Sequence, residues 1–204
     1  MSKESRNRSR AARRAAMKRR LLALWANVSP ADALAGRAWY DRAQSAACEL
    51  WPDDPTRAAA IIAALSPRQR WAVNVAQAAR VIECAQTGAP CPAVGMTGNR
   101  EKAWKIANGG NPADILGGPK VCAFFANITG DHSQVTIDSW AQRAAYGDWQ
   151  EWLTRADTLR KVTAPTGNEY TDIADAYRSA ADIIGISARD FQAAIWIHVR
   201  GAAD

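Results

Sequence analysis

Two side chains in this sequence are best suited to catalysis, and each lies at the start of a predicted helix. Lys120 comes directly after Gly117, Gly118 and Pro119, and Asp138 lies eighteen residues further on. Glycines let a backbone approach a phosphate closely, and a helix that starts behind them directs its first amide groups at the anion. The glycine hairpin therefore predicts a phosphate contact, although a plain connector between two helices fits the same residues.

The stretch around these residues resembles the helix-hairpin-helix DNA glycosylase superfamily, typified by endonuclease III and the 8-oxoguanine glycosylases. The shared features are the hairpin Gly118-Pro119-Lys120 and the segment Ile137-Asp138 that ends at Arg143. The segment SPRQRW, the WY pair near residue 40 and the late QAAIW are similar to small phage-encoded relatives of that superfamily. The resemblance follows the helix order over about residues 60–200 and is sharp across 115–145.

The resemblance implies an enzyme that acts on DNA bases, and it assigns roles to individual residues. Breaking an N-glycosidic bond develops positive charge on the sugar, which the carboxylate of Asp138 would stabilise. A neutral Lys120 amine would attack C1′ and form a Schiff base. Trp140, next but one to Asp138, would stack on the unstacked base. Arg143 would contact either a DNA phosphate or Asp138, and the hairpin of Gly117, Gly118 and Pro119 would bind the DNA backbone.

Three functions remain open on these residues. The simplest is a DNA glycosylase, with or without abasic lyase activity, and hence a DNA-repair enzyme. The second is a phage DNA base-modifying transferase on the same fold, and the third is a DNA-binding protein without enzymatic activity. Each residue also has a plain structural explanation: Asp138 as a helix N-cap, Lys120 as a solvated lysine and Trp140 as a core residue.

The positive charge of the chain is concentrated at its start. Residues 1–20 contain nine lysines and arginines and one glutamate, whereas the remainder is nearly neutral. We expect 1–24 to form a basic tail without stable structure and 25–204 to form one helix-hairpin-helix domain. Such a tail typically binds nucleic acid, although a solubility tail and a membrane-surface helix are alternatives. The residues expected to contact DNA phosphates are Arg13, Arg14, Arg19 and Arg20.

Apolar residues recur at helical spacing in nearly every segment behind the tail, so the predicted fold class is all-α. Helix starts are expected at Ser29-Pro30, at Asp54-Pro55, at a capping box in 66–69 and at Asn111-Pro112. Further helices are expected over 99–107, 120–128, from Asp138, over 170–184 and from Ser187, with a helix and a loop in 148–168.

The composition excludes several classes of protein. Hydrophobic residues make up 48% of the chain and charged residues 23%, as in ordinary globular proteins. No stretch approaches the ~18 apolar residues of a membrane span, and the start lacks a secretory signal. We therefore expect no membrane partner and a cytoplasmic protein, in the host cytoplasm if phage-encoded. Cys84 and Cys91 have no further cysteines at the required spacing, so no iron–sulfur cluster, metal or other cofactor is expected.

Overall fold

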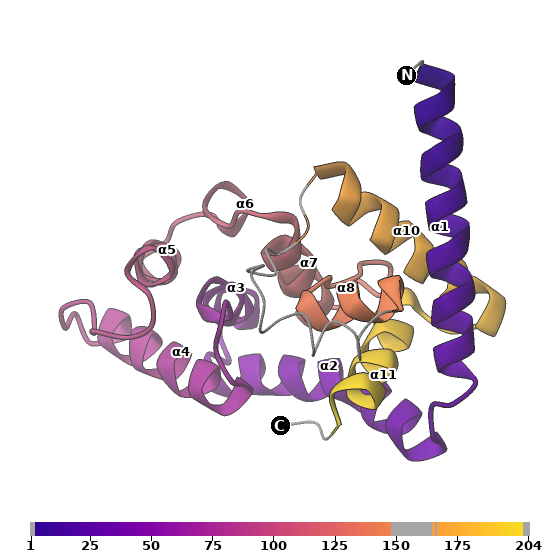
Figure 1. Ribbon diagram of the computed structural model, residues 1–204. Coiled ribbons are helices and arrows are strands. Elements are labelled where there is room, and N and C mark those ends of the chain that lie inside the picture. The colour runs from indigo at the N-terminus through magenta and orange to yellow at the C-terminus, as the bar shows by residue number, and fades with distance from the viewer. Residues whose placement is uncertain (1–2, 148–164, 166, 202–204) are drawn as a thin grey trace, which may run out of the picture. The chain divides into compact units, whose positions relative to one another are not determined.

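The computed structural model describes residues 3–147, 165 and 167–201, and its regular elements are all helices (Figure 1). The predicted all-α class is confirmed. The chain divides into two compact units, Tyr40–Asp131 and a second unit that combines Met1–Trp39 with His132–Ala203. This differs from the single domain expected over 25–204. The sequence pattern shows helices but not which of them pack together, so it carried no signal for this division.

The unit built from the two chain ends contains helix α1 (Lys3–Trp25), the start of α2 (Pro30–Leu50), α8 (Ser139–Tyr146), α10 (Gly167–Ile184) and α11 (Ala188–Arg200). Helix α1 packs along α10 and also contacts α8, while α11 packs on α8 and α10. The core of this unit consists of the fully buried side chains of Met17, Leu21, Ile137, Ile173, Tyr177, Phe191 and Ile195.

The first residues of the chain differ from the tail that we expected over 1–24, because Lys3–Trp25 is a helix packed on the fold. Met17 and Leu21 lie one turn apart and are fully buried. Trp25 stacks on Phe191, with ring centroids 5.1 Å apart. These apolar residues lie in the second half of the helix, behind the arginine-rich stretch that suggested a tail.

The middle unit contains the rest of α2 together with α3 (Pro55–Leu65), α4 (Trp71–Gln86), α5 (Thr97–Ala107), α6 (Pro112–Ile115) and α7 (Pro119–Ile128). Helix α3 lies at its centre, since all its residues from Ala58 to Leu65 are buried and it packs against α4, α5 and α7. The guanidinium of Arg57 donates a hydrogen bond of 2.6 Å to the carbonyl oxygen of Ile106 and ties α3 to α5.

Most helix starts lie where the sequence predicted them. The side chains of Ser29, Asp54 and Ser187 each accept a hydrogen bond from a backbone amide of the first turn. The capping box in 66–69 was wrong: Ser66 ends α3, and its hydroxyl donates to the carbonyl oxygen of Ala63. The helix and loop expected in 148–168 lie mostly outside the described residues.

Candidate functional site

The carboxylate of Asp138 accepts hydrogen bonds from two separate elements. Its Oδ1 atom caps α8 by accepting from the backbone amides of Trp140, at 2.9 Å, and Ala141, at 2.8 Å. Its Oδ2 atom accepts from the indole Nε1 of Trp196 on α11, at 3.0 Å. The predicted N-cap is thus confirmed, and the indole adds a contact that capping does not require. Three donors fix the orientation of a half-buried carboxylate.

Helix α11 packs on α8, which brings Trp196 beside Asp138, and α2 crosses α11 closely at Gly36. A Cβ atom on Gly36 would lie 2.5 Å from the backbone nitrogen of Ala194, so the two helix backbones approach more closely than any side chain permits. Next to this crossing, Trp39 and Trp196 pack with ring centroids 6.3 Å apart. On the same face of α11, the guanidinium of Arg200 lies 4.6 Å from the centroid of the Trp196 ring.

Two buried tyrosines hold the segment that carries Asp138. The hydroxyl of Tyr170 donates to the carbonyl oxygen of Val135 and accepts from the amide of Ile137. Tyr177 donates to the carbonyl oxygen of Ala141, in the first turn of α8, at 3.0 Å. Burial, and secondly the charge of Asp138, raise the pKa of Tyr177 well above its usual value. Tyr177 therefore remains a neutral hydrogen-bond donor at ordinary pH.

Trp140 and Arg143, both expected at the site, form a stacked pair. The guanidinium of Arg143 lies 5.1 Å from the centroid of the Trp140 ring, and both side chains are half-buried. The Nε atom of Arg143 is buried and has no hydrogen-bond partner in the described part of the chain. Two roles were expected for Arg143, as a partner of Asp138 or as a phosphate contact. The structure shows no hydrogen bond or ion pair between Arg143 and Asp138. Base stacking by Trp140 stays a prediction.

The glycine hairpin leads directly into α7. Gly118 has φ 84°, a left-handed conformation that favours glycine, and Pro119 is the first residue of the helix. No side chain caps this helix start, and Gly117, Gly118 and Pro119 are all exposed. Lys120 is half-buried in the first turn, and Lys102 reaches the hairpin from α5, with Nζ 3.6 Å from the position of a Cβ on Gly117.

Lys120 and Asp138 belong to different compact units, Tyr40–Asp131 and the unit of the two chain ends. Of the expected site residues, the structure brings together Asp138, Trp140 and Arg143 on α8. Arg13 and Arg14 lie on α1 with acidic partners on α10, whereas Arg19 and Arg20 are exposed.

Sequence reasoning missed several residues of the site. Trp196 and Arg200 are four residues apart, a spacing that places both on one face of a helix, but no local pattern links that face to Asp138. Lys102 also lacks a signal, because only the packing of α5 beside the hairpin brings it there. Within the described ranges, no three histidine, cysteine or acidic side chains gather as metal ligands. None of the described helices combines the length and apolar character needed to cross a bilayer.

Comparison with known proteins gives a family without an assigned activity. A family model described as a family of unknown function, DUF7178, matches residues 3–203. The chain therefore belongs to the DUF7178 family. No curated protein and no solved structure matches it.

Proposed function

We propose that this DUF7178 protein is a DNA base-directed enzyme, most simply a DNA glycosylase. As the N-glycosidic bond breaks and the base leaves, Asp138 stabilises the positive charge that develops on the sugar. The neutral Lys120 amine forms the new bond to C1′, and opening of the C1′–O4′ bond of the sugar then gives the Schiff base. DNA bound through the hairpin and the basic residues is the substrate.

The observation that carries the proposal is the hydrogen bond from the Trp196 indole to Asp138. Electrostatic catalysis requires a charge that is already oriented before the reaction begins. Here three neutral donors orient the carboxylate, and no lysine or arginine in the described part of the chain forms an ion pair with it. Its negative charge therefore remains available for a sugar cation.

The aromatic residues around Asp138 also support a base as substrate. Trp140 on α8 and Trp196 on α11 are half-buried, and each carries an arginine over its ring, Arg143 and Arg200. Indole rings stack on unstacked bases whatever their sequence, and arginines beside them attract phosphate. A site with this composition favours a flipped nucleotide over a small uncharged metabolite.

The hairpin supports the DNA substrate independently of Asp138. The uncapped amides at the start of α7 and the Lys102 amine form a cationic surface against exposed glycine backbone. Lys120, in the first turn of the same helix, has no side-chain hydrogen bond or ion pair to any described residue. Its amine is thus not held by another side chain, and as a nucleophile it gives up its proton before it attacks C1′.

The test measures free-base release from a panel of DNA duplexes that each carry one modified base. We expect Asp138→Asn to lower the rate at least ~100-fold per folded molecule, the usual cost of losing an electrostatic stabiliser. Asp182→Asn, at an exposed position of α10, is the matched control and should leave the rate unchanged. Unchanged release by folded Asp138→Asn would contradict the proposed role.

Borohydride trapping tests Lys120 separately, because it reduces the Schiff base to a stable protein–DNA adduct. We expect Lys120→Gln to abolish the adduct on abasic duplexes, while Lys105→Gln, at an exposed position of α5, retains it. An adduct that persists in Lys120→Gln would remove this lysine from the mechanism. A mass gain of intact DNA would instead indicate the transferase, and binding without any change in the DNA would indicate a binding protein.

A further inference from the structure

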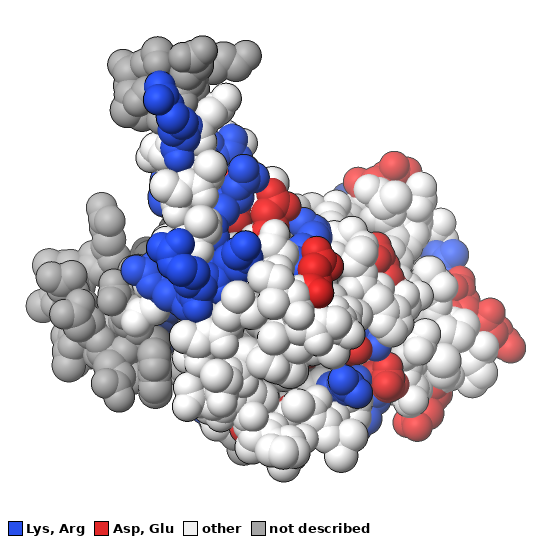
Figure 2. Space-filling view, turned by 90° about the vertical axis from the view of Figure 1, so that its right-hand side faces the viewer, with Lys and Arg blue, Asp and Glu red and all other residues white. Residues whose placement is uncertain are grey.

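The basic residues of α1 fall into two groups that the sequence does not distinguish. Figure 2 shows lysine and arginine side chains gathered along α1, with acidic side chains beside them. The structure describes seven basic side chains on this helix, three of which pair with acidic residues of α10. The other four are Arg8, Lys18, Arg19 and Arg20.

The paired group fastens α1 to α10. Arg10 donates to both carboxylate oxygens of Asp172, with Nη2 2.8 Å from Oδ1 and Nε 3.1 Å from Oδ2. The side chain of Asp172 is only 3% exposed, and Arg13 approaches it at 3.5 Å. The hydrogen bond and the charge of Asp172 raise the pKa of Arg10 above its usual value. Arg10 therefore holds α1 against α10.

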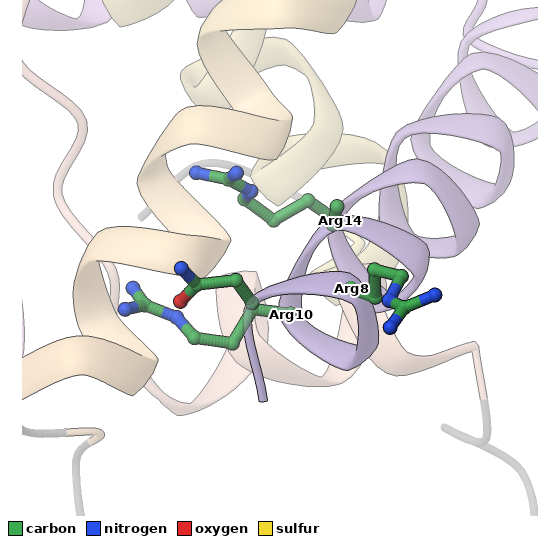
Figure 3. Close-up of a pocket in the computed structure, with 5 residues that line it drawn as sticks. Arg8, Arg10 and Arg14 are labelled. Carbon is green, nitrogen blue, oxygen red and sulfur yellow. The ribbon is translucent and has the colours of Figure 1, made fainter. Parts of the chain in front are cut away.

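A second carboxylate continues this contact one turn along α10. Asp175 binds Arg14 from α1 and Arg178 from its own helix, both at 3.2 Å. Figure 3 shows Arg10 and Arg14 extending from α1 toward α10, while Arg8 extends from the opposite side of the helix. The acidic residues of α10 therefore pair with Arg10, Arg13 and Arg14 and form no ion pair with the other described cations of α1.

The four remaining cations have no hydrogen bond or ion pair to any residue within the described ranges. Arg8, Arg19 and Arg20 are exposed, and Lys18 is half-buried in a hollow between α1 and α10 that Arg14, Asp175 and Arg178 also line. From Arg8 to Arg20 the helix rises about 18 Å at about 1.5 Å per residue. Duplex DNA carries one charge per about 1.7 Å, so this length faces about ten phosphate charges.

We propose that Arg8, Lys18, Arg19 and Arg20 form a docking surface for the phosphate backbone of duplex DNA, here termed the α1 cation surface. The Asp172 and Asp175 contacts hold α1 in place, so the cations are positioned before DNA arrives. The surface positions DNA without reading its sequence, because phosphate contacts carry no base information. This inference rests on the DNA substrate of the proposed function but not on Asp138 or Lys120.

The alternative anionic partner, a lipid surface, does not match the apolar residues of α1. A helix that lies on a membrane inserts an exposed apolar face between the headgroups. In α1 the apolar residues Met17 and Leu21 are buried in the core and Trp25 stacks on Phe191. The large exposed hydrophobic side chains of the described residues lie elsewhere, at Leu34, Val73, Met96 and Ile183.

The experiment measures the salt dependence of binding to an unmodified duplex of arbitrary sequence. Each phosphate contact contributes about −0.9 to the slope of log affinity against log salt, so replacing all four cations by glutamine should flatten the slope by about 3.6. Between about 50 and 200 mM salt, the wild-type protein should therefore lose about 150-fold more affinity than the quadruple variant. Circular dichroism checks that both proteins are equally helical.

The matched control removes four exposed cations that lie outside α1 and likewise have no partner among described residues: Arg37, Arg42, Arg70 and Lys105. It changes the net charge by the same amount and should leave the slope nearly unchanged. If the quadruple α1 variant is misfolded, the pairs Arg8→Gln/Arg19→Gln and Lys18→Gln/Arg20→Gln replace it, with an expected flattening of about 1.8 each.

Two results would overturn the inference: an equal flattening by the control variant, or an unchanged DNA slope in the quadruple α1 variant. Loss of binding to phosphatidylserine vesicles beside an unchanged DNA slope would indicate a lipid surface as the partner. Asp138→Asn should retain the wild-type slope. If the wild-type protein shows no base-directed activity on any duplex while the α1 variant flattens the slope, the proposed chemistry is refuted and the α1 cation surface stands. The opposite pattern would refute the surface alone.

Discussion

Replacing Asp138 with asparagine has a cost that depends on Trp196. The amide oxygen of asparagine accepts from the amides of Trp140 and Ala141 as Oδ1 of Asp138 does. Its NH₂ group then faces the indole Nε1 of Trp196, and two donors oppose each other where a bond of 3.0 Å exists now. If the amide is rotated by half a turn, its NH₂ group instead faces the backbone amides of Trp140 and Ala141, which are also donors. No orientation of asparagine satisfies all three donors.

The size of the effect follows from these contacts. An unsatisfied donor costs about 1–3 kcal/mol, and a lost negative charge at a helix start costs about 0.3–1 kcal/mol. We therefore expect Asp138→Asn to lower the free energy of unfolding by about 2 kcal/mol in the wild-type background. In a Trp196→Phe background the opposing donor is absent, so the same substitution should cost less than about 1 kcal/mol.

Urea unfolding of the wild type, the two single variants and the double variant completes a double-mutant cycle. The expected coupling is about 1–2 kcal/mol, well above the roughly 0.5 kcal/mol within which independent sites are additive. Equal costs of Asp138→Asn in both backgrounds would refute the hydrogen bond between the indole and the carboxylate. Base release should be lost with Asp138→Asn in either background, because the charge is absent from both.

Two further predictions concern packing and pH. Gly36→Ala should destabilise the fold by about 1–3 kcal/mol, since its methyl group would overlap the backbone of Ala194. Gly98→Ala is the control, because a Cβ atom there has nothing within 4 Å, and it should be neutral or slightly stabilising. Thermal unfolding compares the two variants. Burial, and then the hydrogen bond to Glu169, raise the pKa of Tyr146 to about 12. The folded state therefore keeps the phenol proton at a pH where the unfolded chain has lost it. This contribution to stability disappears as the pH rises from about 10 to about 12. In Tyr146→Phe, unfolding followed over that range should show a smaller loss of stability than in the wild type, and an equal loss would contradict the assignment.

The sequence predicted local structure well because local signals determine helix ends. Asp54, Asp138 and Ser187 lie at caps that residue type and spacing indicate. It did not predict that Lys3–Trp25 is packed, because the acidic partner of Arg10 lies 162 residues away at Asp172. Contacts of that kind depend on the tertiary packing of α1 on α10.

The same limit applies to the candidate site. Asp138 and Arg143 were predicted from one continuous segment, whereas Trp196 reaches Asp138 from 58 residues further along the chain. The glycine at position 36 that permits the close approach of α11 looks, in the sequence, like an unfavourable residue inside a helix. Its reason is a neighbouring backbone that only the folded chain supplies.

Two aspartates that cap helices in this protein show why capping alone does not account for Asp138. Asp54 caps α3 with Oδ1, and its Oδ2 binds the guanidinium of Arg57 at 2.7 Å, so its charge is neutralised. Asp138 caps α8 in the same way, but its Oδ2 accepts from a neutral indole. A carboxylate has about four acceptor sites, and the three donors to Asp138 leave one free. A cap needs only the first oxygen. The indole adds a fixed orientation without adding positive charge, and the role proposed for Asp138, in which its carboxylate stabilises a transient sugar cation, requires that combination.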